Sequence, residues 1–262
     1  MKALVLSAMS DIGIELVSKF KSENIEVFGT YNRNLPNLEI LPKENWFKFQ
    51  VEDFYSKRYQ SWLSEIAPWD MFISCVGTLK PIGNFEENNP LEWVEGVNQN
   101  STYQVASLMT ALPYRNKEKI TTAIFFAGGG TNSATSAYSS YTIGKISLIK
   151  SVELLNHELN DLKVSILGPG WVNTKIHSDT IEAKEKAGKN FQKTINILNQ
   201  PENMNPIKKV VEDVFKIIDL PKDLMGGRNF SSVYDDLSVD NLKRLLKINP
   251  DFYKLRRASN NQ

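Results

Sequence analysis

The sequence contains few of the residues that build disulfides or metal sites. Cys75 is the single cysteine among 262 residues, which excludes an internal disulfide and favours a reducing compartment. It lies inside the apolar run 71–76, so we expect a small buried side chain rather than a reactive thiol. The two histidines, His157 and His177, are too few and too far apart in the chain to predict a metal site.

The chain also lacks an excess of charge and a long hydrophobic run. Its 31 basic and 30 acidic residues give a net charge of +1, which provides no basic field for nucleic acid and favours small-molecule partners. No segment approaches the roughly 20 apolar residues that span a bilayer. The apolar start of the chain is followed at once by Asp11 and Glu15, so it predicts a buried strand rather than a signal peptide. We expect a cytoplasmic protein with no membrane association.

Short apolar runs alternate along the chain with segments of helical periodicity. A chain of 262 residues can form one α/β domain. The alternation predicts a parallel sheet with helices on both faces, whose ligands bind beyond the carboxyl ends of the strands. The predicted strands are 3–6, 26–30, 47–51, 71–76, 122–126, 164–167 and 229–236. The predicted helices are 12–22, 55–66, 91–112 and 140–159.

Tyr141 and Lys145 lie four residues apart on a predicted helix, a spacing that places a phenol and an ammonium on the same face. A nearby ammonium lowers the pKa of a phenol from its free value of about 10. Such a tyrosine could donate or accept a proton near neutral pH. The same spacing also occurs by chance, in which case the two residues have no shared chemistry.

A turn that could bind a nucleotide follows the first predicted strand. It has the sequence Ser-Ala-Met-Ser-Asp-Ile-Gly, ends at Gly13 and leads into a helix, whose first amides could bind a pyrophosphate. Ser7 and Ala8 keep the turn small with less backbone freedom than glycine would give. Asp11 is predicted to cap the helix, with its carboxylate directed toward the helix amides. The alternative is an ordinary strand, turn and capped helix.

Together these features resemble the short-chain dehydrogenase/reductase family, over residues 3 to about 234. The resemblance implies a Rossmann-type, doubly wound parallel sheet in three α/β/α layers. It further implies a single NAD(P)-binding domain over residues 1–262, with a substrate lid at about 176–200 and a C-terminal tail at about 237–262. Members of the family act on small molecules, and we expect a homodimer or homotetramer.

The resemblance also assigns functions to individual residues. It implies that Tyr141 is the catalytic acid/base, that Lys145 holds the nicotinamide ribose, and that Asn98 anchors a water for proton relay. Further cofactor contacts are implied for residues of the first turn, of the third and fourth strand ends, and of the Pro-Gly loop. These are Ser7, Ser10, Ile12, Gly13, Val51, Gly77, Pro169, Gly170, Val172 and Thr174.

The end of the second predicted strand bears on the choice of cofactor. An NAD site usually has an acidic residue there for the ribose diol, but none occurs before Glu39. Arg33 could instead pair with a 2′-phosphate. We therefore predict NADP, with NAD as the alternative.

One position departs from the family pattern. The catalytic serine usually lies thirteen residues before the tyrosine, where this chain has Gly128. Either Thr131, Asn132 or Ser133 holds the substrate oxygen, or backbone amides of the glycine run 128–130 do so, or catalysis has been lost. His177 is a weaker candidate for contact with substrate.

The sequence thus predicts an NADP-dependent oxidoreductase that moves a hydride between nicotinamide and a carbonyl or secondary alcohol. The glycine run and the Pro-Gly-Trp loop resemble those of reductases of bacterial surface-sugar pathways, which implies a sugar-like substrate. The alternative is a nucleotide-binding regulatory or scaffold protein that has the same fold and no turnover.

Overall fold

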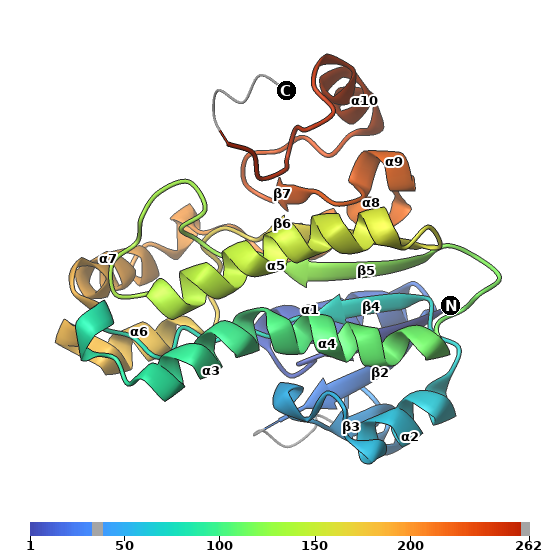
Figure 1. Cartoon of the computed structure of the whole chain (residues 1–262), viewed down its shortest axis with the longest axis horizontal. Coiled ribbons are helices and arrows are strands. Elements are labelled where there is room, and N and C mark those ends of the chain that lie inside the picture. The colour runs from blue at the N-terminus through green and yellow to red at the C-terminus, as the bar shows by residue number, and fades with distance from the viewer. Residues whose placement is uncertain (33–38, 258–262) are drawn as a thin grey trace.

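The computed structural model describes residues 1–32 and 39–257, and its strands form one parallel sheet (Figure 1). The strand order is β3-β2-β1-β4-β5-β6-β7. The strands are β1 (Lys2–Leu6), β2 (Glu26–Tyr31), β3 (Trp46–Lys48), β4 (Met71–Ser74), β5 (Thr121–Phe126), β6 (Leu162–Gly168) and β7 (Asn229–Ser231). The predicted doubly wound α/β sheet is confirmed.

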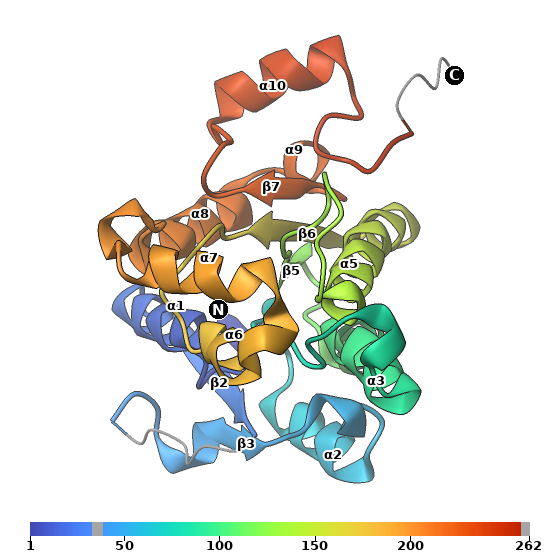
Figure 2. The ribbon, with the colours of Figure 1, turned by 90° about the vertical axis from the view of Figure 1, so that its left-hand side faces the viewer.

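Helices cover both faces of the sheet (Figure 2). Helices α1 and α8 pack on one face, and α2, α4 and α5 pack on the other. The helices are α1 (Asp11–Ser22), α2 (Lys57–Ile66), α3 (Pro90–Asn100), α4 (Thr102–Ala111), α5 (Ser139–Glu158), α6 (His177–Ala183), α7 (Lys189–Leu198), α8 (Ile207–Asp219), α9 (Lys222–Met225) and α10 (Val239–Ile248). In the described part of the chain, none is long and apolar enough to cross a membrane.

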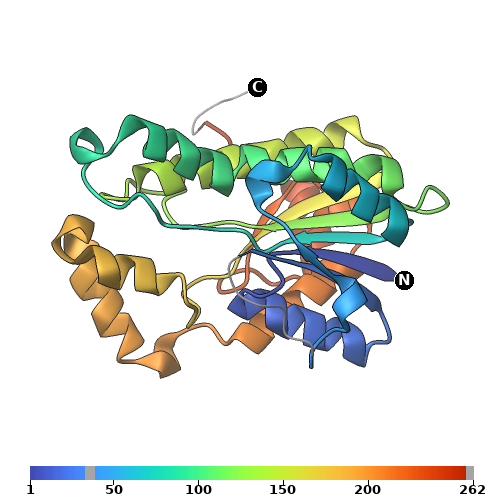
Figure 3. The same ribbon diagram turned by 90° about the horizontal axis from the view of Figure 1, so that it is seen from below.

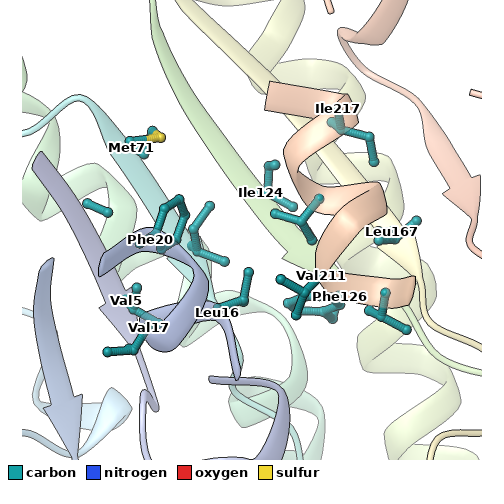
Figure 4. Close-up of a cluster of buried hydrophobic side chains, with 14 of the residues drawn as sticks. Val5, Leu16, Val17, Phe20, Met71, Ile124, Phe126, Leu167, Val211 and Ile217 are labelled. Atoms are coloured by element: carbon teal, nitrogen blue, oxygen red, sulfur yellow. The ribbon is translucent and has the colours of Figure 1, made fainter. Parts of the chain in front are cut away.

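The strands are apolar on both faces because each face is covered by helices. In β1, Ala3 and Val5 join the cluster beneath α1 and α8, whereas Leu4 and Leu6 join the cluster beneath α2, α4 and α5. Figure 4 shows the first of these clusters, in which side chains from the strands meet those of α1 and α8. A continuous apolar run such as 3–6 is therefore the sequence signature of a strand buried on both sides.

The topology brings the ends of β1 and β4 together. Strand β1 pairs with β2 on one side and with β4 on the other, so that Leu6 lies opposite Ser74. The strand order reverses at this point, and the segments that follow β1 and β4 leave the sheet side by side. Open α/β sheets bind ligands at such a switch point.

The predicted helix 91–112 is in fact two helices. The chain breaks at Ser101, whose φ of −145° and ψ of −83° are not helical. The Asn100 amide donates to the carbonyls of Gly96 and Thr78, both at 2.8 Å, and its oxygen accepts the Thr78 N–H at 3.2 Å. The side chain thereby binds the backbone of a neighbouring loop, an interaction that periodicity alone does not reveal.

The C-terminal tail covers the edge of the sheet. Strand β7 is shorter than the predicted 229–236, and its Asn229 N–H donates to the Tyr253 carbonyl at 2.8 Å. The Arg228 guanidinium donates to the carbonyls of Pro250 and Phe252 at 3.0 and 2.7 Å. An exposed edge strand would invite pairing with another chain, and the tail prevents this.

Candidate active site

The predicted site residues gather beyond the carboxyl ends of the strands. Three segments distant in sequence meet there: the turn after β1, the loop after β4, and the first turns of α5. The lid segment (residues 176–200, containing α6 and α7) lies at the same end of the molecule as α3, as Figures 1 and 3 show. The fold therefore places the nucleotide turn and the tyrosine helix at one end.

Tyr141 lies in the first turn of α5, with its hydroxyl against the backbone that follows β5. A Cβ placed on Gly128 would be 2.1 Å from the Tyr141 Oη. Burial, together with the nearby Tyr138, raises the pKa of Tyr141 to about 12. This is opposite to the lowering expected from Lys145. At neutral pH the phenol keeps its proton and can act as a donor.

Lys145 is buried one helical turn further along α5. Its Nζ donates to the Phe126 carbonyl at 2.8 Å and to the Val76 carbonyl at 3.3 Å, at the ends of β5 and β4. Nζ lies 6.0 Å from the centre of the Tyr141 ring. Burial lowers the pKa of Lys145 to about 8. The predicted pair is thus brought together, but the ammonium is bonded to backbone carbonyls rather than to the phenol.

Asn100, rather than the predicted Asn98, reaches this group of residues. The Asn98 side chain accepts a hydrogen bond from Thr102 Oγ1 at 2.7 Å and is partly exposed on the helix surface. Asn100 is fully buried at the break between α3 and α4. A Cβ placed on Gly77 would be 3.8 Å from both Asn100 Oδ1 and Lys145 Nζ. Asn100 and Lys145 therefore meet beside Gly77, whereas the role of Asn98 in anchoring a relay water remains a prediction.

The turn after β1 has the tight packing expected of a nucleotide turn. A Cβ on Gly13 would be 2.7 Å from the Ser7 carbonyl oxygen, so only glycine fits at the start of α1. Ser7 adopts a φ of 56°, a left-handed conformation that glycine favours, and its N–H donates to Thr30 Oγ1 at 2.9 Å. Ser10 caps α1 by accepting the Gly13 N–H at 3.1 Å.

Asp11 is not the helix cap, so that prediction was wrong. It is the first residue of α1, and its carboxylate accepts the Lys175 N–H at 2.7 Å. The Lys175 ammonium lies 3.7 Å from the same carboxylate. The negative charge beside the turn is therefore balanced by Lys175, at the entry to the lid segment.

A cavity of about 530 Å³ lies over the ends of β1, β2 and β4. Its volume is within the roughly 300–1,000 Å³ of small-molecule and cofactor sites. The predicted residues Ser7, Val51 and Gly77 line it, together with Tyr31. A Cβ on Gly77 would make only ordinary contacts, so packing of the protein itself does not require glycine, and the space above it is free for a ligand. These residues fit a dinucleotide.

Ile12 is partly buried and packs against the core cluster beneath α1. Arg33 lies outside the described residues. The outer wall of the cavity carries the carboxylates of Glu52, Glu92 and Glu95.

The Pro-Gly loop after β6 is held in place by hydrogen bonds and close packing. The Pro169 carbonyl accepts from Asn205 Nδ2 at 2.7 Å. Gly170 has a φ of +75°, and a Cβ there would be 2.4 Å from Val233 Cγ2. Val172 is buried, and its carbonyl accepts from Thr174 Oγ1 at 3.4 Å. The loop has a fixed conformation at the end of β6, and its contact with nicotinamide remains a prediction.

His177 is held by this loop. Its Nε2 lies 2.9 Å from the Val172 carbonyl, and its ring stacks on Trp171 at 5.0 Å between centroids. Burial lowers the pKa of His177, so the ring is neutral at pH 7 and donates from Nε2 to this carbonyl. These contacts favour a role in joining the loop to α6 over the predicted contact with substrate.

The glycine run after β5 leaves no hydroxyl at the usual serine position. Asn132 and Ser133 are exposed to solvent, and Thr131 is partly exposed. Gly130 has a φ of +96°, and a Cβ there would be 2.6 Å from Thr142 Cγ2. The run packs too closely on α5 for larger residues at positions 128 and 130.

No metal site is seen in residues 1–32 and 39–257, where no three His, Cys, Asp or Glu side chains come together. Burial raises the pKa of the Cys75 thiol to about 12, so the thiol stays protonated. The side chain is partly rather than fully buried, and its raised pKa agrees with the prediction of an unreactive cysteine.

No protein-family model matches the sequence, and no curated protein matches it. Solved structures do resemble it. A short-chain dehydrogenase/reductase from Saccharomyces cerevisiae has 18% identity and a TM-score of 0.77, over 91% of this chain and 98% of that one. The ligand-free aldohexose dehydrogenase of Thermoplasma acidophilum has 14% identity and a TM-score of 0.72, over 91% and 96%.

A variant of the actinorhodin polyketide ketoreductase with NADPH has 18% identity and a TM-score of 0.73, over 88% of this chain and 94% of that one. At these identities the likeness shows the fold. The chain has the Rossmann-type fold of the short-chain dehydrogenases/reductases, as the motifs predicted.

The sequence analysis missed Asn100, Lys175 and Tyr138. For Asn100 the polar run at 98–101 within an otherwise amphipathic helix was a signal of a helix break. Lys175 follows the Pro-Gly loop directly, and its contact with Asp11 spans 164 residues of sequence. No local pattern could have indicated that contact.

We expect Gly128→Ser to disturb Tyr141 instead of restoring a missing function. The serine Cβ would overlap the Tyr141 hydroxyl, so either the ring or the loop must move. A crystal structure of the variant should show Tyr141 displaced, and its melting temperature should fall. Gly129→Ser is the matched control, because a Cβ at Gly129 has no neighbour within 4 Å. Equal behaviour of the two variants would contradict the packing described here.

The depressed pKa of Lys145 should make stability depend on pH. Lys145 has a pKa of about 8 in the folded protein and 10.5 in the unfolded chain. Between these two pH values the unfolded chain keeps the proton and the folded protein has lost it. The contribution of Lys145 to the free energy of unfolding therefore increases as the pH rises. The free energy of unfolding of wild type minus that of Lys145→Met should increase across this window. This difference can increase by at most about 1.4 kcal/mol per pH unit, and urea titrations should detect the increase. A difference that stays constant from pH 8 to 10.5 would show that Lys145 has an ordinary pKa.

Proposed function

We propose that the protein is an NADP-dependent oxidoreductase that reduces a carbonyl to an alcohol. The observation that carries this proposal is the convergence of Tyr141, Lys145 and Asn100 beside the cavity at the ends of β1 and β4. The fold, shared with short-chain dehydrogenases/reductases at TM-scores up to 0.77, supports it. Bound NADPH would supply the hydride.

In this proposal Tyr141 gives its hydroxyl proton to the substrate oxygen as the carbonyl carbon accepts the hydride. A pKa of about 12 keeps the phenol in the acid form at neutral pH, which suits reduction better than oxidation. Lys145 places a positive charge next to Gly77, where a nicotinamide ribose would lie. Asn100 fixes the loop after β4 through two hydrogen bonds with the Thr78 backbone, and so positions the wall of the cofactor site.

The cofactor would lie in the 530 Å³ cavity, with its pyrophosphate at the amino end of α1. Ser7, Ser10 and Gly13 shape the turn, and the Lys175 ammonium offsets the charge of Asp11. The choice of NADP over NAD depends on Arg33 and the lack of an acidic residue at the end of β2.

The immediate surroundings of Tyr141 are apolar. Leu79, Ile82, Ile176 and Phe191 pack in one cluster with the tyrosine ring. We propose a substrate whose carbonyl carries apolar groups, with any polar part directed along the acidic wall of the cavity. This environment suits a polyhydroxylated sugar less well than the sequence analysis implied.

Gly128 favours a second candidate, a nucleotide-binding protein without turnover. Because Gly128 has no hydroxyl, the site lacks one of the groups that would hold a substrate oxygen. Such a protein would bind NADPH and never oxidise it, whatever carbonyl compound is offered. A panel of ketones and aldehydes, followed by nicotinamide absorbance, separates the two candidates.

We expect Tyr141→Phe to lower kcat by about 10² to 10⁴ while NADPH binding is kept, because it removes the proton donor and little else. Steady-state kinetics on a substrate from the panel and titration calorimetry with NADPH would measure the two quantities. Tyr55→Phe, at an exposed tyrosine, is the control and should match wild type. A Tyr141→Phe variant that keeps more than a few per cent of the rate would rule out this tyrosine as the acid.

We expect the protein to bind NADPH more tightly than NADH. Arg33→Ala should reduce that preference by roughly the 1.5–3 kcal/mol of a hydrogen bond to a charged group. Calorimetric titrations of wild type and variant with both cofactors would test this. Equal affinity of wild type for the two cofactors would refute the assignment of Arg33.

A further inference from the structure

The Tyr138 hydroxyl joins the start of α5 to the lid segment. Its oxygen lies 2.7 Å from Thr180 Oγ1 on α6, and Thr194 on α7 is a second hydrogen-bond partner. Both threonines are almost completely buried, at 1% exposure each. Buried hydroxyl groups almost always have a hydrogen-bond partner. The contact among the hydroxyls of Tyr138, Thr180 and Thr194 therefore helps to hold the lid segment closed.

Tyr138 and Tyr141 lie close together at the start of α5. Tyr138 directly precedes α5, and Tyr141 lies in the first turn of that helix. Both rings pack into the cluster that contains Leu79, Ile82 and Ala187. The through-space effect of Tyr138 on the pKa of Tyr141 agrees with this proximity.

The hydrogen-bonding capacity of Tyr138 is not used up by the threonines. A phenol hydroxyl has one donor hydrogen and two acceptor lone pairs. When Thr180 and Thr194 both donate to it, its own hydrogen remains available for a third group. Apart from the Tyr141 hydroxyl, the side chains that share its cluster are hydrocarbon, so a substrate oxygen beside Tyr141 is the partner that would complete the set.

The usual position for a second oxygen-holding group cannot carry one here. Any side chain at residue 128 would overlap the Tyr141 hydroxyl. Asn132 and Ser133 are exposed. Tyr138 is the hydroxyl that shares a cluster with Tyr141 and that the lid itself orients.

We propose that Tyr138 replaces the missing serine: its hydroxyl, accepting hydrogen bonds from Thr180 and Thr194, donates one to the substrate carbonyl oxygen. The inference rests on the proposed reductase function. Tyr138 transfers no proton. It stabilises the charge that develops on the oxygen, while Tyr141 delivers the proton.

This arrangement makes the donor depend on lid closure. Thr180 and Thr194 belong to the lid segment, so the Tyr138 hydroxyl is oriented only when α6 and α7 cover the site. Thr180 is a positioning residue, because it acts on the substrate through Tyr138. A substrate that holds the lid closed would therefore also complete the oxygen-binding site.

The test compares Tyr138→Phe, Thr180→Val and Thr180→Ser with wild type on a carbonyl substrate. Removing one donor to a developing oxyanion typically lowers kcat by about 10² to 10³. We expect a loss of about that size for Tyr138→Phe, with NADPH affinity close to wild type. The melting temperature should fall for both Tyr138→Phe and Thr180→Val, because each removes one side of a buried hydrogen bond. Thr180→Val should lose less, and Thr180→Ser should restore most of what Thr180→Val loses. Tyr55→Phe is the control.

Other results would overturn the inference. If Tyr138→Phe keeps the wild-type kcat while Tyr141→Phe does not, the proposed function stands and the role of Tyr138 is wrong. If Tyr138→Phe loses activity only in proportion to lost NADPH affinity or melting temperature, its role is structural. If wild type reduces no carbonyl compound yet binds NADPH, both the function and this inference fail.

Discussion

The site depends on the burial of one ammonium at the ends of two strands. Lys145 Nζ bonds the carbonyls of Phe126 and Val76, and so fixes α5 against β5 and β4. A buried charge is costly unless its hydrogen bonds are satisfied, which restricts Lys145 to this position. With Lys145 fixed, Tyr141 one turn earlier can only point at the backbone of Gly128. Glycine at position 128 is then required by the Tyr141 hydroxyl, and Asn100, at the break after α3, meets Lys145 beside Gly77.

The closed lid is the second constraint on function. It is linked to the body on several sides: Lys175 to Asp11, Tyr138 to Thr180, and Lys80 to Asp179 and Glu182 at 3.4 and 3.1 Å. Asn190 also donates to the Ser136 carbonyl at 2.8 Å. Two of these links, Lys175 to Asp11 and Tyr138 to Thr180, involve residues of the proposed cofactor and substrate sites. The lid thus contributes to the burial that raises the pKa of Tyr141 and keeps its phenol protonated, which is the condition for a proton donor.

The sequence predicted the features that arise from local patterns. Apolar runs such as 3–6 located the buried strands, and the spacing of Tyr141 and Lys145 located the centre of the site. Features that depend on distant contacts could not be predicted. Asn98 was chosen over Asn100 because nothing local shows which amide meets Thr78. Asp11 was predicted as a cap because its partner, Lys175, is 164 residues away. The lowered pKa expected for Tyr141 was wrong because burial raises it, and because the Lys145 ammonium is bonded to backbone carbonyls rather than to the phenol.

The account depends most on Tyr141 being a neutral phenol at physiological pH. The direct measurement is a pH titration of the folded protein followed by the near-ultraviolet absorbance of phenolate. The absorbance of the Tyr141→Phe variant is subtracted from that of wild type at each pH. A pKa of about 12 predicts no difference between the two proteins from pH 7 to about 10. If wild type has one more tyrosine than the variant that ionises between about pH 7 and 9, Lys145 lowers the pKa of Tyr141. That result would contradict the account.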